Sequence, residues 1–537
     1  MNLSDALRAI SDATGIPVGG DAASISVGGH SLATPSDLNP LDMKSAFPAR
    51  GYGDQREKLL YMFVEDGTAP GENRPTDAGL RERISEYVSS VRDDASRERL
   101  AEVMRAQYWT KPKRGRAAHL LPFHSSLPHG FRLHTRYKMY RGNLLAHLAW
   151  TGAGFDTELL DDLLELFNAD GDFSRLDRLF VRAAESWAGE ATATAETLLL
   201  APGAEDVRAT LESGGPYCQP HLDQFQADLR EVLSLRGRMP RRDLIDTLTL
   251  LTGFHLGTYY YRVALTLGEG LDRVAALASG AADPGGGCDC SGGLGACALA
   301  GRIQFRTGTG GYRAASERDA SVRSYRDVHL NRLMSLAASI IAANHAGWLW
   351  TTLGGPGWYA ANGDEAWGKP RLGELAAALT ADSSFAATYD AAAWALAAVY
   401  AHSNQNADLG DVANASSGVV ALRHAITSHQ RSFLRKYSAD VVNMLIRPQQ
   451  DAGHLIAGNG TRISFFELDE PLIFLLVRLV CGERPRRADE FLAALRRYGL
   501  EPQDRSERER LLAALERLGM VRKYSDAGES TYVKHPL

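Results

Sequence analysis

A chain of 537 residues is too long for one ordinary hydrophobic core, so we expect it to fold as more than one domain. Its apolar fraction of 45% and charged fraction of 23% are those of globular proteins and exclude a mostly disordered chain. A formal net charge of −6 excludes a uniformly basic nucleic-acid coat, while a local basic patch is still compatible with it.

Features along the chain predict a cytoplasmic location without membrane contact. The first residues, MNLSDALRAISDATG, contain acids and lack an apolar core flanked by basic side chains, so no signal peptide is expected. An odd count of five cysteines fits a reducing compartment. The apolar stretches Leu333–Leu349 and Leu375–Tyr400 are interrupted by polar side chains, which favours buried helices over membrane spans.

The pattern of charge and helical periodicity predicts four segments. Residues 1–102 are acidic and combine helical pieces with loops rich in Gly, Ser and Pro, such as Gly19–Pro35. Residues 103–280 form a helical domain that includes a basic and aromatic stretch, and residues 281–467 combine a Gly- and Arg-rich segment with a second helical region. Residues 468–537 form a C-terminal module. The predicted fold class is therefore mainly α, a multidomain helical protein.

The basic and aromatic stretch has the strongest charge asymmetry in the sequence. Between Val103 and Phe155 there is no Asp or Glu, while nine basic side chains alternate with aromatic rings and histidines. Cations neutralise phosphates and rings stack on bases, so this composition favours a nucleic acid. Docking against an acidic partner, including this chain's own N-terminal part, and a plain solvated surface are the alternatives. The candidate nucleic-acid-binding residues are Arg105, Trp109, Lys111, Lys113, Arg114, Arg116, Arg132, Arg136, Lys138 and Arg141.

The middle of the chain predicts buried helices and a second basic segment. Phe254–Thr266 (FHLGTYYYRVALT) is aromatic and nearly uncharged, as expected of a central core helix. A Gly-rich break follows at Gly280–Gly295, and Gly301–Arg332 then carries seven arginines. The second set of candidate nucleic-acid contacts comes from this segment: Arg302, Arg306 and Arg313.

Cysteines near the Gly-rich break are candidate metal ligands. Cys218 and His221 form a C-x-x-H pair, and Cys288, Cys290 and Cys297 form C-x-C-x6-C. Thiolate and imidazole ligands in a set of four are what tetrahedral zinc prefers, so zinc is the cofactor that this set would hold. The spacing differs from a standard zinc knuckle. The alternatives are small residues in a Gly-rich turn and a nest of backbone N–H groups that binds an anion.

The motifs of common enzymes are absent from the sequence. It contains no G-x-x-x-x-G-K-[ST] phosphate loop, no G-x-S-x-G nucleophile elbow and no H-E-x-x-H zinc helix. We therefore expect a non-catalytic protein. Two alternatives stay open: a metal-dependent hydrolase or nuclease with a dispersed site that uses the Cys/His cluster, and a structural protein that forms homo-oligomers.

The last 70 residues predict a winged helix-turn-helix. Leu472–Val480, Ala488–Tyr498 and Ser506–Leu518 have the patterns of three helices, and alternating residues around Asp526–Gly528 indicate a hairpin. The third helix would be the recognition helix of a DNA-binding protein. Residues 468–537 carry 13 Lys and Arg against 12 Asp and Glu, so protein docking is as well supported as DNA contact. The candidate contacts in this module are Arg508 and Lys523.

Three segments resemble accessory proteins of bacterial anti-phage systems. They are the C-terminal ISFFELDEPLIFLLVRLVCGERPRRADEFLAALRRYGLEP with the wing VRKYSDAGESTYV, the core segment FHLGTYYYRVALTL, and Asp289-Cys290-Ser291. They are similar to the DptG-like non-ATPase subunits of phosphorothioation-dependent restriction systems and to proteins of methylation-associated defence systems. The resemblance implies a restriction-modification-like complex in which a helical partner of an ATPase, methyltransferase or nuclease helps to hold DNA. It transfers no catalytic residue.

If the basic and aromatic stretch grips phosphates, DNA binding should weaken steeply as salt is added. Each neutralised phosphate contributes about −0.9 to the slope of log affinity against log salt concentration. A gel-shift series with the purified chain at increasing salt measures this slope. The absence of binding even at low salt would contradict direct contact and leave the adaptor role.

Overall fold

The described part of the chain is mainly helical, in agreement with the predicted class. The computed structural model describes residues 2–34, 93–108, 150–168, 173–179, 216–286, 293–307, 330–355, 372–403, 409–429, 431–432, 434–435, 446–447, 456–459, 463–524 and 530–536. Among the helices in these ranges, none combines the length and the apolar character that crossing a membrane requires.

The N-terminal residues form a helix and a three-stranded meander. Helix α1 (Leu3–Thr14) begins at Asn2, whose side chain accepts a hydrogen bond from the backbone N–H of Asp5 at 2.8 Å. The strands are antiparallel in the order β1-β2-β3. The bounds are β1 (Val18–Gly20), β2 (Ser24–Val27) and β3 (His30–Ala33). The sequence predicted a loop here because the strands are short and rich in Gly and Ser.

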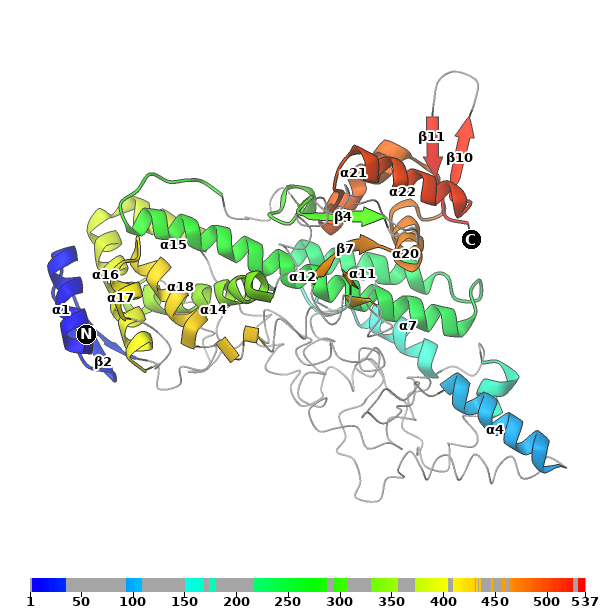
Figure 1. Cartoon of the computed structure of the whole chain (residues 1–537), viewed down its shortest axis with the longest axis horizontal. Helices are drawn as coiled ribbons and strands as arrows, with labels where there is room; N and C mark the ends of the chain where they lie inside the picture. The colour runs from blue at the N-terminus through cyan, green and yellow to red at the C-terminus, as the bar shows by residue number, and fades with distance from the viewer. Residues whose placement is uncertain are drawn as a thin grey trace.

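A long helix, α12 (Arg241–Ala278), runs between the helical bundle and the C-terminal elements (Figure 1). At 1.5 Å per residue its 38 residues span roughly 57 Å. The predicted core segment Phe254–Thr266 lies in its middle, where residues 248–264 are all buried. Helices packed on several sides explain why this part lacks a polar face.

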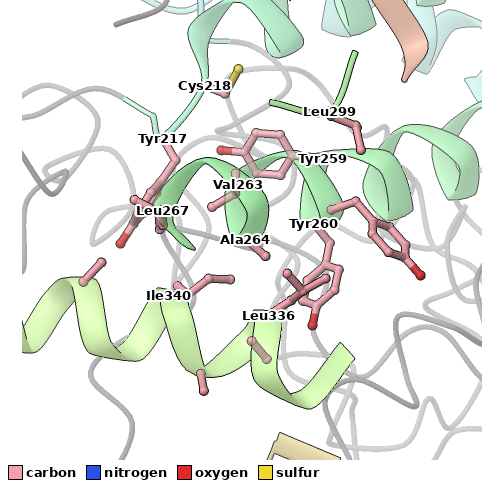
Figure 2. Packing of buried hydrophobic residues seen from close by; sticks show 14 of the residues in the cluster. Tyr217, Cys218, Tyr259, Tyr260, Val263, Ala264, Leu267, Leu299, Leu336 and Ile340 are labelled. Carbon is pink, nitrogen blue, oxygen red and sulfur yellow. The ribbon is translucent and has the colours of Figure 1, made fainter. Parts of the chain in front are cut away.

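The described part of the bundle around α12 contains five further helices. Their bounds are α14 (Leu330–Thr352), α15 (Leu372–Ala381), α16 (Ser383–Ser403), α17 (Leu409–Ala413) and α18 (Gly418–His429). Figure 2 shows Tyr260, Ala264 and Leu267 of α12 facing Leu336 and Ile340 of α14. Helix α1 packs against α16, so the N-terminal unit covers the far end of the bundle (Figure 1).

Three other helices are described before α12. Helix α11 (Gln219–Leu233) packs along α12, and α7 (Thr157–Asn168) packs against α11 through leucines on one face. The opposite face of α7 carries exposed acidic side chains, as an amphipathic surface helix requires. Helix α4 (Asp94–Tyr108) is the third.

A strand from the middle of the chain completes a sheet beside the C-terminal helices. The sheet has the order β5-β6-β7-β4-β9, and β4 is parallel to both of its neighbours. Strand β7 is antiparallel to β6, which is parallel to β5. The bounds are β4 (Ile303–Thr307), β5 (Ile446–Arg447), β6 (Ile456–Asn459), β7 (Ile463–Leu468) and β9 (Leu500–Pro502), and the short 3-10 helix η3 (Leu294–Ala296) precedes β4.

The C-terminal elements follow the order helix, strand, helix, helix, strand, strand, with β9 before the third helix. Their bounds are α20 (Glu470–Cys481), β8 (Arg486–Arg487), α21 (Ala488–Leu495) with the 3-10 helix η5 (Arg496–Tyr498), α22 (Arg505–Arg517), β10 (Val521–Tyr524) and β11 (Ser530–Val533). Aspartates at positions 469 and 504 cap α20 and α22 by accepting backbone hydrogen bonds. The strands form a sheet in the order β10-β11-β8.

Helices α16 and α18 approach closely at Gly418, so Gly418→Ala should destabilise the protein. A Cβ there would overlap the backbone oxygen of Asp390, and the Gly418 N–H donates to the Asp390 carboxylate at 2.8 Å. Overpacking of this kind costs about 1–3 kcal/mol. Gly373→Ala in α15 is the control, because a Cβ there meets no atom within 4 Å and alanine favours a helix. Urea unfolding measures both, and equal free energies of unfolding for the two variants would contradict the prediction.

Candidate functional site

Helices α11 and α12 each carry two polar side chains seven residues apart on the faces where they meet. His221 and Asp228 lie on α11, and His255 and Arg262 lie on α12. Seven residues make about two helical turns, so the two members of each pair share a face. All four side chains are at most 4% exposed. Such burial requires that their polar atoms be satisfied within the protein.

These side chains form one continuous series of hydrogen bonds, here named the buried polar chain, which ends at Tyr498 of η5. Nε of Arg262 donates to Nδ1 of His221 at 3.2 Å. Nε2 of His221 lies 3.2 Å from Nδ1 of His255, and Nε2 of His255 lies 2.9 Å from Oδ2 of Asp228. The Tyr498 hydroxyl donates to Oδ1 of Asp228 at 3.0 Å.

The donor at one end determines the protons of the whole series. A guanidinium can only donate, so Nδ1 of His221 must accept and its proton must be on Nε2. His221 then donates to His255, which in turn donates from Nε2 to Asp228. Burial, followed by the charge of Arg262, lowers the pKa of His221 well below its ordinary value. Two imidazoles thus connect a buried guanidinium to a carboxylate.

Asp228 receives its other hydrogen bonds from Gln224 and Tyr498. Nε2 of Gln224 donates to Oδ1 of Asp228 at 2.7 Å and also lies 3.3 Å from the Tyr498 hydroxyl. Burial, and next the nearby carboxylate, raise the pKa of Tyr498 well above its ordinary value. The phenol therefore stays protonated and donates to Asp228 over the whole physiological pH range.

The C-terminal elements are attached to α11 and α12 by polar contacts that are at least partly buried. Nη2 of Arg262 donates to the backbone oxygen of Arg497 at 2.6 Å, beside the contact of Tyr498 with Asp228. On α20, Arg478 is 2% exposed and forms an ion pair of 2.8 Å with Glu231 of α11. These contacts hold α20 and η5 in one orientation on the two long helices.

The beginning of α22 is held by β4. Glu507, in the first turn of α22, is 4% exposed and accepts a hydrogen bond from the backbone N–H of Thr307 at 2.9 Å. The backbone N–H of Gln503 donates to the carbonyl of Phe305 at 3.0 Å. Strand β4 therefore covers the turn that leads into α22.

A further buried histidine lies in the bundle. Nδ1 of His345, on α14, donates to the backbone oxygen of Ile341 at 2.9 Å, and Nε2 contacts the hydroxyl of Tyr400 on α16. Burial lowers the pKa of His345 to about 4. His345 is therefore neutral in the folded protein at physiological pH.

The structure does not bring the candidate metal ligands that it describes together in a group of three. His221 belongs to the buried polar chain, with both ring nitrogens in hydrogen-bond contacts. Cys218 is buried just before α11, and buried Cys297 lies 3.9 Å from the Thr266 hydroxyl. Within the described ranges no group of three His, Cys, Asp or Glu is arranged to hold a metal ion. Two of the five candidates, Cys288 and Cys290, lie outside the described residues, so the zinc site stays a prediction.

Most of the basic and aromatic stretch also lies outside the described residues. Arg105 is part of α4, but the structure does not describe its side chain. The remaining candidates of that stretch and the later Arg313 fall in ranges that are not described: Trp109, Lys111, Lys113, Arg114, Arg116, Arg132, Arg136, Lys138 and Arg141. Their contact with nucleic acid stays a prediction.

The described candidate arginines and lysine have different environments. Arg302 is exposed and pairs with Glu269 at 3.0 Å. Arg306 is 3% exposed, with its Nε 3.9 Å from Glu507, so its position in β4 offers almost no surface to a phosphate. Arg508 is exposed on α22, and Lys523 of β10 pairs with Glu516 at 2.7 Å.

Sequence reasoning missed the buried polar chain. From the sequence, His221 is expected only as a metal ligand, and Asp228, His255, Arg262 and Tyr498 are not among the predicted site residues. The signal available was the seven-residue spacing from His221 to Asp228 and from His255 to Arg262 in helices that are otherwise apolar at these faces. Tyr498 is more than 230 residues further along the chain, and only the tertiary structure brings it close.

One comparison with known families finds a match in the same region. The family model described as methylation-associated defense system protein MAD7 matches residues 196–281, which include α11 and α12 and four members of the buried polar chain. A comparison with curated proteins finds no match. The similarity to methylation-associated defence proteins is thus confirmed, and the similarity to DptG-like subunits stays a prediction.

His221 is neutral in the folded protein. The free energy of unfolding of the protein should therefore decrease when the pH falls below about 6.5. The unfolded chain takes up a proton on His221 there and the folded chain does not, so the free energy of unfolding decreases by up to about 1.4 kcal/mol per pH unit. His345 contributes with the same sign down to about pH 4. We expect His221→Gln to have a shallower slope than wild type in urea unfolding between pH 5 and 6.5. An unchanged slope would contradict the neutral assignment.

Proposed function

We propose that this protein is a non-catalytic, DNA-binding subunit of a bacterial methylation-associated defence complex, and that residues 468–537 form a winged helix-turn-helix. The observation that carries the proposal is the order of the C-terminal elements together with their pairing. The first strand, β8, pairs with β11, which pairs with β10. A winged helix has this arrangement, with α22 as its third helix and β10–β11 as its wing.

The packing of α22 supports this assignment. Leu511, Ala514 and Leu515 are buried against the other C-terminal elements, while Arg505 and Arg508 are exposed. The hairpin of β10 and β11 projects away from the helical body (Figure 1). The projecting wing also presents the exposed Arg522, a cation of the kind that contact with a DNA backbone requires.

The burial of the buried polar chain supports a structural role for it and no catalytic one. An aspartate that orients a histidine is also a common arrangement for general-base catalysis, as in Asp228 and His255. A general base must reach its substrate, however, and these side chains are 2% exposed. We therefore interpret the series as a structural connection between α11, α12 and the C-terminal elements.

The defence assignment rests on the family match of residues 196–281. Partners of the proposed complex are an ATPase, a methyltransferase or a nuclease that acts on the DNA. Protein docking by the C-terminal module is the second candidate function. The observation in its favour is that several cations of α22 are paired with acids of the same module.

Deleting the gene from a host that carries it should increase the number of phage plaques, and expression of the wild-type chain should restore protection. In parallel, the purified full-length chain should shift a labelled duplex DNA at low salt, because exposed arginines would contact phosphates. Unchanged plaque numbers after deletion would contradict the defence role. Protection by a chain that shifts no DNA would contradict the DNA-binding role and support docking.

A further inference from the structure

The sheet β10-β11-β8 carries a row of cationic and aromatic side chains on one face. Arg522 of β10 is opposite Tyr532 of β11, which is opposite Arg487 of β8. Residues that are directly opposite each other in a sheet point to the same side. The next row contains Val533, which is fully buried, so that row faces the module's core and the Arg-Tyr-Arg row faces outward.

Lys534 extends this outer sheet face, which we define as Arg487, Arg522, Tyr532 and Lys534. Lys534 lies two residues after Tyr532. Its backbone N–H donates to the carbonyl oxygen of Met520 at 2.9 Å, which continues the pairing of β11 with β10. Arg487 and Arg522 are exposed, while Tyr532 and Lys534 are partly buried. The face thus joins three cations to one phenol.

The cations of the outer sheet face are less compensated than those of α22. Within the described residues Arg522 and Lys534 form no ion pair, and Arg487 has one exposed pair of 3.2 Å with Asp489. Exposed pairs of this kind contribute little energy and exchange readily for a phosphate. Two of the three cations therefore have no ion-pair partner in the described part of the chain.

Helix α22 is in a different electrostatic state. Arg505 pairs with Glu509 at 3.1 Å within the helix, and Arg510 pairs with Glu507 at the same distance. Arg517 lies 3.9 Å from Glu470. Exposed glutamates on the helix would face the phosphates of any groove that it entered, which is unfavourable.

The position of β4 restricts α22 further. A third helix that enters the major groove does so with its N-terminal residues. Here the first turn of α22 is packed on β4, with Glu507 accepting from the backbone of Thr307 at 2.9 Å. The first turn of α22 is therefore fixed to the protein on its Glu507 side, and this contact limits how the helix can be oriented toward a groove.

We propose that the C-terminal module contacts the phosphate backbone of duplex DNA through its outer sheet face and not through α22 in a groove. The proposal rests on the DNA-binding role proposed above and identifies the surface that performs it. Arg487, Arg522 and Lys534 neutralise phosphates, and the partly buried Tyr532 contributes its hydroxyl to the backbone instead of stacking on a base. Such contacts carry no base readout, so binding is independent of sequence.

Two double variants of the full-length chain test this surface against α22. Arg487→Glu with Arg522→Glu reverses two charges on the outer sheet face, and Arg505→Glu with Arg508→Glu reverses two on α22. The pairs are matched, since each contains one arginine with an ion pair to a nearby acid and one without an ion pair among the described residues. Thermal melts check that both variants fold, and Gln replaces Glu where a melt shows loss of structure.

Fluorescence anisotropy with a labelled duplex, measured at several salt concentrations, gives the affinity and the salt slope. The sheet variant should lose about two units of slope, because each lost phosphate contact removes about 0.9, and at least roughly tenfold in affinity at low salt. The α22 variant should keep a slope near that of wild type. Two duplexes of unrelated sequence should bind equally well.

The outcomes separate the two proposals. Loss of binding in the α22 variant alone, or equal loss in both variants, overturns the assignment to the sheet while the DNA-binding function stands. A preference for one duplex sequence that the α22 variant abolishes overturns it as well. A wild-type chain that binds neither duplex overturns the DNA-binding function and this surface together.

Discussion

The buried charge of Arg262 is the constraint on which the arrangement of the long helices depends. An ion transferred to a protein interior is strongly destabilising unless a partner compensates it. Its carboxylate partner, Asp228, is reached only through two imidazoles, and each link is a hydrogen bond of about 3 Å. A shift of α11 along α12 by one turn would break every link. The series therefore specifies the register of the two helices, which apolar contacts alone leave less defined.

The same constraint extends to the C-terminal module. Tyr498 donates a hydrogen bond to Asp228, and the carbonyl of Arg497 accepts from Arg262, so the module supplies hydrogen bonds to both buried charges. Strand β4 adds a second requirement because it lies between β7 and β9. The five-stranded sheet that contains β9 can form only after residues 303–307 have paired with β7 and β9. Contacts this distant in sequence are slow to form and make the C-terminal elements part of a larger folding unit.

The sequence predicted the features that depend on local patterns. Helices α20 and α22 were predicted from their caps and apolar spacing, and the middle of α12 from its lack of charge. The meander at β1–β3 was not predicted, because short strands of Gly and Ser resemble a loop. Strand β4 was missed since its pairing partners come 160 to 200 residues later. The candidate site was also missed because its members are distant in the sequence. The seven-residue spacing from His255 to Arg262 indicates that they share one face of a helix. No local signal shows that this face meets Asp228 of α11 or Tyr498 of η5.

The electrostatics of the C-terminal module show why charge counts along a sequence do not locate a binding surface. Its 13 cations and 12 acids predict a nearly neutral unit. Pairing in three dimensions distributes that balance unevenly: α22 combines arginines with glutamates one turn away, whereas Arg522 and Lys534 form no ion pair with any residue that the structure describes. A phosphate group is attracted by the electrostatic potential at the surface that it contacts, and the net charge of the whole module does not describe that potential. Strand alternation, which brings Arg487, Tyr532 and Arg522 into one row, is therefore more informative about DNA contact than the net charge.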